Sequence, residues 1–285
     1  MTALTQRNRQ SHTRRIREGS GRWWLFAGFI IITAVVLIPI AANVWLSLGS
    51  DQLTGNADSF SLNNYFHVIS STDVLGWLTN SLIVTGITVV VAVFVAAPAG
   101  YVISRARGRL VSSYALILFI VQSLPVITAI IPLFLLFSDL GLVDKLSGLV
   151  IVYVGATLSV AIWMMAAYFD SVPIALEEAG WMDGCSVFGG FIRIVLRNSL
   201  PGLLSTGIFS FLLAWNDYLI ASVFIRSSEK FTLPLGLESF FQQYATDWGS
   251  VMSVSVIMML PPIIIFSVLN KYFSIGGIGG SLAGR

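Results

Sequence analysis

Residues 23–48 read WWLFAGFIIITAVVLIPIAANVWLSL and contain no charged side chain. An α-helix rises ~1.5 Å per residue, so about 20 apolar residues cross the hydrocarbon core of a bilayer. The run exceeds that length, and it also exceeds the apolar core of about 7 to 15 residues found in cleaved signal peptides. We therefore expect it to stay in the membrane as a helical anchor.

The whole chain shares this apolar character. Of its 285 residues, 56% are hydrophobic and 11% are charged, whereas soluble domains carry about 25% charged residues. The formal net charge of +2 and the single cysteine, Cys185, argue against a nucleic-acid-binding protein, a disulfide scaffold and a thiolate metal site. The composition predicts an integral membrane protein.

Five further stretches reach spanning length. In lipid every backbone amide must be satisfied internally, so apolar stretches this long are expected to be helices rather than strands. The sequence predicts an all-α membrane protein with six transmembrane helices near residues 23–48, 77–103, 111–137, 146–169, 201–225 and 250–270.

Charges outside the spans predict domain boundaries and orientation. We expect a disordered basic tail over residues 1–22, a six-helix membrane domain over 23–272 and a glycine-rich tail over 273–285. Six Lys and Arg residues fall in the first tail, three near 104–110, two in the 170–200 loop and two at the C-terminus, against three on the opposite side. By the positive-inside rule, both termini are expected in the cytoplasm.

Ionisable groups inside the predicted spans are scarce. Asp217 is the only acid or base there, and both histidines, His12 and His67, fall outside. A membrane-embedded enzyme or proton pump needs paired titratable groups at depth, and no G-x-x-x-x-G-K-[ST] phosphate loop is present. We therefore predict no catalytic residue, metal site or bound cofactor. Any energy that drives this protein's activity must therefore come from an ion gradient or from another protein chain.

The fifth span carries the polar run Trp215-Asn216-Asp217. Amide and carboxylate groups bind hydroxyls, and a tryptophan ring stacks on sugar rings, so these residues could line a solute path. Alternatively, Asp217 marks the outer end of a helix or pairs with a neighbouring helix. Both interpretations are open at this point.

The third span holds Gln122 and Ser123 beside Pro125 and Pro132. Proline breaks or bends a helix and frees backbone carbonyls, which here could line a cavity. The alternative is a packing seam, in which small and polar residues join neighbouring helices.

Residues 176–202, LEEAGWMDGCSVFGGFIRIVLRNSLPG, form a polar island between apolar stretches. We expect a helix to start at Pro173, whose fixed φ suits the first helical position, and to stop at Gly184 in a left-handed conformation. Ser186 is expected to cap a second helix. Its apolar stripe at i, i+3, i+4 and i+7 consists of Phe188, Phe191, Ile192 and Val195.

Helices this short are marginal in water and need a partner. A helix lying on lipid favours Lys and Arg on its polar face, whereas Glu177, Glu178 and Asp183 would be repelled by anionic lipid. The charge pattern therefore favours a groove on another protein.

This segment resembles the EAA loop of ABC importer permeases, which reads E-A-A, three residues, G, nine residues, I-x-L-P. The motif positions are occupied here, at the matching spacing, by Glu178, Ala179, Gly180, Asp183, Gly184, Ile194 and Leu196. Two positions depart from the pattern: Gly180 replaces the second alanine, and Arg197 replaces the proline. Without that proline, the second helix could extend toward Asn198.

From about residue 60 onward, the chain resembles the carbohydrate branch of this family, the maltose-type MalG-like subunits. The matching positions are Asn80-Ser81, Ile131-Pro132-Leu133-Phe134, Gly141-Leu142, Trp215-Asn216-Asp217 and Asp247-Trp248-Gly249 with Met252. The C-terminal Lys271-Tyr272-Phe273, followed by Gly276, Gly280 and Gly284, resembles the family tail that enters the ATPase dimer.

The resemblance implies a non-enzymatic permease subunit of an ATP-driven importer in a bacterial inner membrane. It implies a MalF-like second permease subunit, a cytoplasmic ATPase dimer that uses ATP and Mg, and an external sugar-binding protein. Residues 176–202, Glu177 included, would then be the coupling helix that docks on the ATPase. The implied cargo is a di- or oligosaccharide, or a related polyol or glycerol phosphate.

An ion-coupled secondary transporter of a small polar solute is the alternative. Such transporters often show inverted repeats and several ion ligands near the bilayer midplane. Neither feature is evident in this sequence, and a secondary transporter would not explain the EAA spacing.

Overall fold

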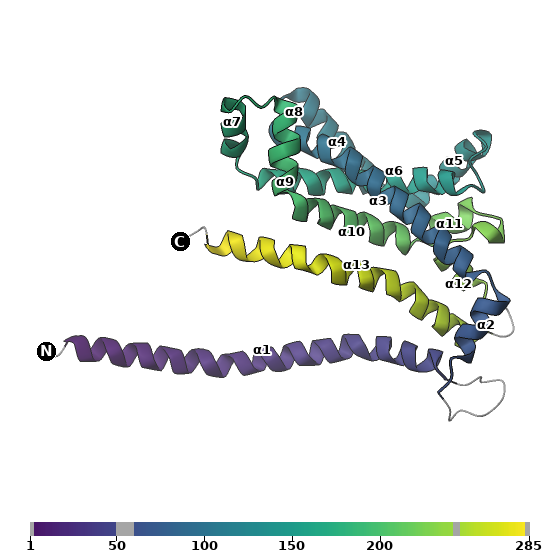
Figure 1. Cartoon of the computed structure of the whole chain (residues 1–285), viewed down its shortest axis with the longest axis horizontal. Coiled ribbons are helices and arrows are strands. Elements are labelled where there is room, and N and C mark those ends of the chain that lie inside the picture. The colour runs from purple at the N-terminus through teal and green to yellow at the C-terminus, as the bar shows by residue number, and fades with distance from the viewer. Residues whose placement is uncertain (1–2, 50–59, 242–245, 283–285) are drawn as a thin grey trace.

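The computed structural model describes residues 3–49, 60–241 and 246–282, with side-chain surroundings for 23–49, 60–241 and 246–272. Within these ranges the chain is helical and forms no strand. Figure 1 shows the arrangement of α1 (Ala3–Ser47), α2 (Asn63–Ser71), α3 (Val74–Arg105), α4 (Arg109–Ser123), α5 (Val126–Asp139), α6 (Leu146–Asp170), α7 (Ile174–Met182), α8 (Val187–Gly190), the π-helix η1 (Phe191–Val195), α9 (Leu196–Asn198), α10 (Leu200–Trp215), α11 (Leu219–Phe224), the 3-10 helix η2 (Ser228–Lys230), α12 (Leu233–Glu238) and α13 (Trp248–Leu282).

Four helices are each long and apolar enough to cross a membrane: Trp23–Ser47 within α1, α3, α6, and Trp248–Tyr272 within α13. Two further helix pairs also pass this test but are bent. The pair α4 and α5 bends by 96°, and the pair Val187–Asn198 and Leu200–Trp215 bends by 75°. The described residues therefore provide six spans if each bent pair counts as one, which confirms the all-α fold class.

The predicted third and fifth spans are both interrupted, the third between α4 and α5 and the fifth between α10 and α11. Between α4 and α5, Leu124 and Pro125 have extended backbone, as the proline predicts. The expected single helix over 201–225 is wrong, because α10 ends at Trp215 and α11 begins only at Leu219. A polar run thus interrupts an apolar span that hydropathy alone joins together.

Helix α3 is the centre of the bundle. It packs along α6 and α10, and its contact with α6 is close because Gly100 has no side chain. A Cβ at Gly100 would lie 2.9 Å from the backbone nitrogen of Ala166 and 3.0 Å from the carbonyl oxygen of Ile162. A buried cluster beside this crossing joins α3, α6 and η1 through Ala96, Ala97, Ile162, Met165, Phe169, Phe191 and Val195.

Helix α1 stands away from this bundle. No side chain over residues 23–46 is buried. At the Ser47 end of α1, the carbonyl oxygen of Ser47 accepts hydrogen bonds from Asn64 Nδ2 of α2 at 3.0 Å and from Ser253 Oγ of α13 at 3.5 Å. Figure 1 shows α1 running apart from the other helices beyond this point. The helix continues back to Ala3, which differs from the disorder expected for residues 1–22; no proline interrupts that stretch.

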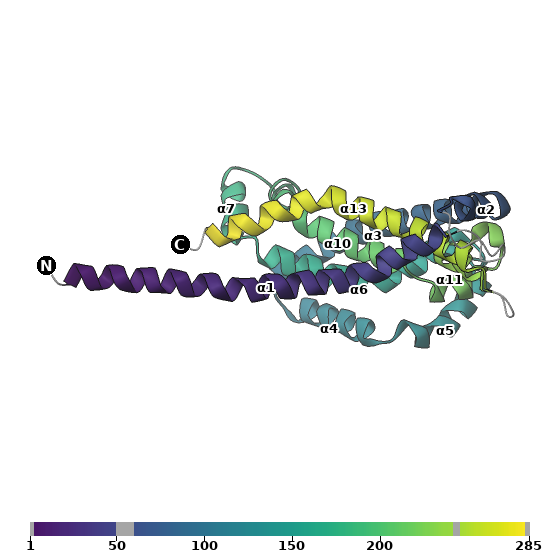
Figure 2. The same cartoon turned by 90° about the horizontal axis from the view of Figure 1, so that it is seen from below.

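The two ends of the molecule carry different elements. In both views the beginning of α1, the end of α13 and helix α7 lie at one end, whereas α2 and α11 lie at the other (Figures 1 and 2). The segment 170–200 therefore shares an end with both termini.

Candidate coupling site

The segment 170–200 forms two helices joined by a tight turn. Helix α7 starts directly after Pro173, and Gly184 adopts φ +88°, the left-handed conformation that glycine accepts most easily. Ser186 caps the second helix, since its Oγ accepts a hydrogen bond of 3.1 Å from the Gly189 amide. That helix runs from α8 through η1 and α9 to Asn198, so it extends beyond Arg197 as the missing proline predicts.

One face of this two-helix loop points into the protein. Glu177 is 1% exposed, and Gly180 is also buried. The side chain of Ile194 covers Gly180 so closely that a Cβ there would lie 2.3 Å from Ile194 Cδ1. Gly180 thus allows the two helices of the loop to approach each other, and the alanine usual in the family would require Ile194 to move. Leu196 packs against the cluster that joins α3, α6 and η1.

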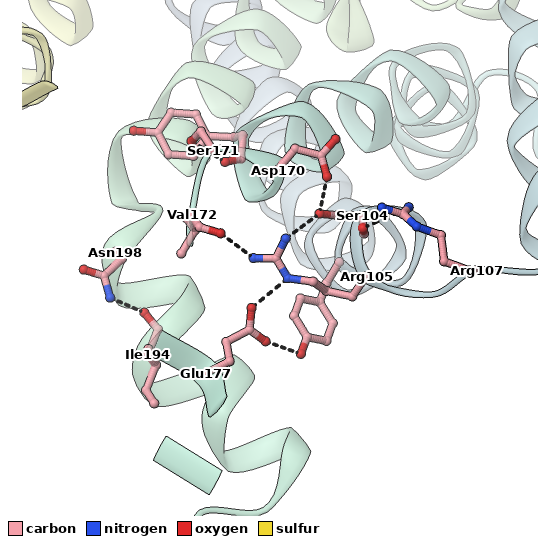
Figure 3. A network of polar contacts seen from close by, with 11 residues as sticks. Ser104, Arg105, Arg107, Asp170, Ser171, Val172, Glu177, Ile194 and Asn198 are labelled. Atoms are coloured by element: carbon pink, nitrogen blue, oxygen red, sulfur yellow. Dashed lines mark hydrogen bonds and ion pairs between the residues drawn. The ribbon is translucent and has the colours of Figure 1, made fainter. Parts of the chain in front are cut away.

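Glu177 is held by hydrogen bonds to both of its carboxylate oxygens. Arg105 Nε donates to Oε1 at 2.7 Å, and the Tyr101 hydroxyl donates to Oε2 at 2.6 Å. Figure 3 shows Arg105 between Glu177, Ser104 and the carbonyl of Val172. Sequence reasoning placed Glu177 among the docking residues, but burial leaves it no surface for a partner. The sequence did not point to Tyr101 as a site residue, and Arg105 was counted only among the three positive charges near residues 104–110.

The opposite face of the loop is open. It carries exposed acidic and apolar side chains, and Met182 and Phe188 are 88% and 73% exposed. We call this surface the docking face, and it consists of Glu178, Ala179, Met182, Asp183, Val187, Phe188 and Ile192. The motif residues are thereby divided into an inward set, with Glu177, Gly180 and Ile194, and an outward set, with Glu178, Ala179 and Asp183.

The polar run of the fifth span lies at the break between α10 and α11. Trp215 is 1% exposed, stacks on Phe211 and donates from Nε1 to the carbonyl of Met258 at 3.2 Å. Asn216 is exposed and donates to Leu212. The structure therefore separates three residues that the sequence placed together: the indole faces the core, the amide is open, and Asp217 turns toward α6.

Gln122 and Ser123 lie exposed at the end of α4, next to the 96° bend. Ser123 Oγ donates to the Phe119 carbonyl at 2.8 Å, and Thr128 Oγ1 donates to the Pro125 carbonyl at 2.7 Å. Both hydroxyls therefore satisfy backbone carbonyls near the break. Of the C-terminal residues, Gly276 and Gly280 fall within α13, where side-chain surroundings are not described, and Gly284 lies outside the described residues.

The described residues combine spanning helices with a two-helix loop at one end of the molecule. The chain belongs to the family of binding-protein-dependent transport system inner membrane components, whose model matches residues 88–275. It is therefore an inner membrane component and a transport subunit of the ABC importer class, which decides against a secondary transporter.

Similar proteins carry the same assignment. The inner membrane ABC transporter permease protein YcjP of Escherichia coli is 35% identical over 73% of this chain and 74% of its own length. The trehalose/maltose transport system permease protein MalG of Thermococcus litoralis is 29% identical over 92% and 96%. A bacterial ABC transporter that imports the acidic polysaccharide alginate has the same fold, with a TM-score of 0.75, 23% identity and coverage of 89% and 98%.

Proposed function

We propose that this permease forms half of the transmembrane path for a sugar, either a di- or oligosaccharide or a related polyol or glycerol phosphate. An external binding protein delivers the sugar, and a cytoplasmic ATPase dimer drives its movement. The observation that carries this proposal is the docking face, which combines exposed acidic and apolar side chains on a two-helix loop. The MalG relative, which belongs to a trehalose/maltose system, supports the carbohydrate class.

The docking face fits a groove on the ATPase. Met182, Val187 and Phe188 are large apolar side chains that water does not favour, while Glu178 and Asp183 supply charge for specific pairing. Gly184 sets the angle between the helices that present them. In this proposal ATP and Mg are bound by the ATPase, and this chain binds neither.

A second permease subunit explains the bare surface of α1. A spanning helix can face lipid, but α1 is exposed on nearly every side over residues 23–46. The bundle also carries an open groove of about 700 Å³. This groove lies between α3, α10 and α13 and is lined by apolar side chains and two glycines, including Gly86, Val90, Phe94, Leu204, Gly207 and Leu269. Small residues let helix backbones approach closely in membranes. We propose that a MalF-like subunit covers α1 and this groove.

The solute path is proposed to pass the break between α4 and α5 and the break between α10 and α11. Broken helices expose backbone carbonyls and amides, which membrane transporters tolerate where they line a cavity. Gln122, Ser123 and Asn216 offer exposed hydrogen-bonding groups beside these breaks. Trp215 and Asp217 would support the path without lining it, because both make hydrogen bonds to neighbouring helices. Both termini and the docking face lie on the cytoplasmic side in this proposal.

Reconstitution tests the proposed function. The chain is co-expressed with the products of its neighbouring genes, purified as a complex and placed in liposomes with the binding protein. ATPase activity is then measured across a panel of sugars. We expect stimulation by one sugar class only, together with uptake of that sugar. Stimulation by amino acids or inorganic ions instead of sugars would contradict the carbohydrate assignment.

A further inference from the structure

We propose that Tyr101, Arg105 and Glu177 form a strut that transmits movement of the two-helix loop to α3. The inference rests on the proposed function, since it assumes that the docking face receives a push from the ATPase. It assigns a role to residues that lie behind the docking face: Glu177 is buried, and Tyr101 and Arg105 are partly buried. Glu177, which is 1% exposed, is the residue through which the loop is attached.

Arg105 connects four parts of the chain at the end of α3. Its Nε donates to Glu177 of α7 at 2.7 Å, and its Nη2 donates to the Val172 carbonyl in the link between α6 and α7 at 2.9 Å. Its Nη1 donates at 3.0 Å to Ser104 Oγ, which in turn donates to Asp170 at 2.6 Å at the end of α6 (Figure 3). A planar guanidinium that makes several hydrogen bonds at once fixes orientation as well as distance.

Tyr101 attaches the second helix of the loop to the same point. Its hydroxyl donates to Glu177, and its ring lies 4.7 Å from the ring of Phe191 in η1 and 6.1 Å from that of Phe169 in α6. One turn of α3 therefore contacts α7 through a carboxylate and η1 through an aromatic ring. The two helices of the loop cannot rotate relative to α3 without breaking one of these contacts.

The strut ends on the helix that is best placed to pass movement onward. Helix α3 crosses α6 at Gly100, one residue before Tyr101, with backbone in direct contact across the crossing. It also packs along α10, and α6 and α10 lead to the break at Asp217, where Tyr153 of α6 holds the carboxylate. A displacement of the loop would thus reach the proposed solute path through the close α3–α6 crossing and through side chains that are held by hydrogen bonds.

The test uses Glu177→Gln and Tyr101→Phe in the reconstituted complex with its ATPase and binding protein. Glu177→Gln removes the charge and keeps the volume, while Tyr101→Phe removes only the hydroxyl and keeps the ring on Phe191. We expect both variants to co-purify with the ATPase and to hydrolyse ATP. Sugar transported per ATP should fall by about tenfold in Glu177→Gln, the factor expected for loss of one charge-assisted hydrogen bond, and by less in Tyr101→Phe. Glu238→Gln, an exposed acid at the far end, is the matched control.

The outcomes separate the strut from the docking face. Unchanged transport per ATP in both variants, with normal wild-type transport, would overturn the strut alone. Loss of ATPase co-purification would also overturn it, because the cluster would then act on docking. A wild-type complex that moves no sugar would overturn the proposed function and the strut with it. A thermal shift alone, without a change in transport per ATP, would show a purely structural role and overturn the inference.

Discussion

The Tyr153 hydroxyl of α6 donates a hydrogen bond of 2.8 Å to Asp217 Oδ2, and the same oxygen accepts hydrogen bonds of 3.0 and 3.1 Å from the backbone amides of Ile220 and Ala221. Asp217 therefore caps the start of α11 from two residues before it. The carboxylate satisfies amides that a break inside a lipid-facing span would otherwise leave unpaired. A neighbouring helix thus holds the break in place.

Replacing Asp217 should destabilise the fold before it affects sugar recognition. Asp217→Ala removes the cap and leaves the Tyr153 hydroxyl unpaired, so we expect a loss of about 1–2 kcal/mol in the free energy of unfolding. Tyr153→Phe should cost less and leave the KM for sugar unchanged. Thermal unfolding and uptake kinetics check both, with Tyr114→Phe, half-exposed on α4, as the control. An increase in KM for Asp217→Ala without a change in stability would instead place Asp217 in the solute path.

Gly184 should tolerate only residues that accept a left-handed backbone. Its φ of +88° is unfavourable for a β-branched side chain, whereas asparagine adopts such conformations more readily. We expect Gly184→Val to reduce sugar uptake to near background while membrane insertion stays normal, and Gly184→Asn to retain most uptake. Near-normal transport by Gly184→Val would show that the turn geometry is not needed for coupling.

The crossing of α3 and α6 should not accept a side chain at Gly100. A Cβ there would lie 2.8 Å from Met165 Cβ and close to the α6 backbone, so neither neighbour can rotate away. We expect Gly100→Ala to cost about 1–3 kcal/mol in unfolding free energy, measured by thermal unfolding in detergent. Gly155→Ala on α6 is the control, because a Cβ at Gly155 meets nothing within 4 Å. Equal stability of the two variants would contradict the close crossing.

Asp144 should make the α2 end of the molecule sensitive to acid. The Ser227 hydroxyl, the Ser227 and Arg226 amides and the Lys230 ammonium group donate to its carboxylate and hold its pKa below the ordinary value. A lowered pKa in the folded state stabilises the fold above the unfolded pKa of about 4, and this gain is lost as the pH falls through the lowered value.

The isosteric change Asp144→Asn measures this contribution. Asparagine tolerates the left-handed φ of +57° found at this position. The variant keeps one oxygen for the Arg226 and Ser227 amides but loses the charge and the second oxygen, which accepts from Ser227 Oγ and Lys230 Nζ. We expect it to be about 1 kcal/mol less stable at pH 7, a modest figure because solvent screens the partly exposed group. The difference should shrink as the pH approaches 3, and Ser227→Ala should show a smaller effect of the same sign. A difference that stays constant from pH 7 to pH 3 would contradict the assignment.

Hydropathy and turn chemistry predicted the elements that depend on local sequence. The apolar runs became helices, Pro125 broke the third span, and Gly184 formed the turn. One of the two interpretations of Asp217 was that it marks a helix end or pairs with a neighbouring helix. The sequence did not reveal that Tyr153, far away in the chain, is the partner or that a new helix starts two residues later.

The same limit explains the two neighbouring acids of the loop. Glu177 and Glu178 have the same side-chain chemistry, and both were expected to contact the ATPase. Arg105, placed by the fold of α3, turns Glu177 inward and leaves Glu178 exposed. A contact between residues distant in sequence therefore distinguishes a buried glutamate from an exposed one.

The isolation of α1 has a consequence for biogenesis. Residues 23–46 of this first helix are not buried, and Ser47 at its end makes hydrogen bonds to Tyr65 and Asn64, so insertion of the helix does not require the rest of the bundle to have folded. We proposed above that a second permease subunit covers α1, and without that subunit the exposed side chains of residues 23–46 stay uncovered. If that proposal holds, a chain expressed without the second permease subunit should be degraded faster than one expressed with it.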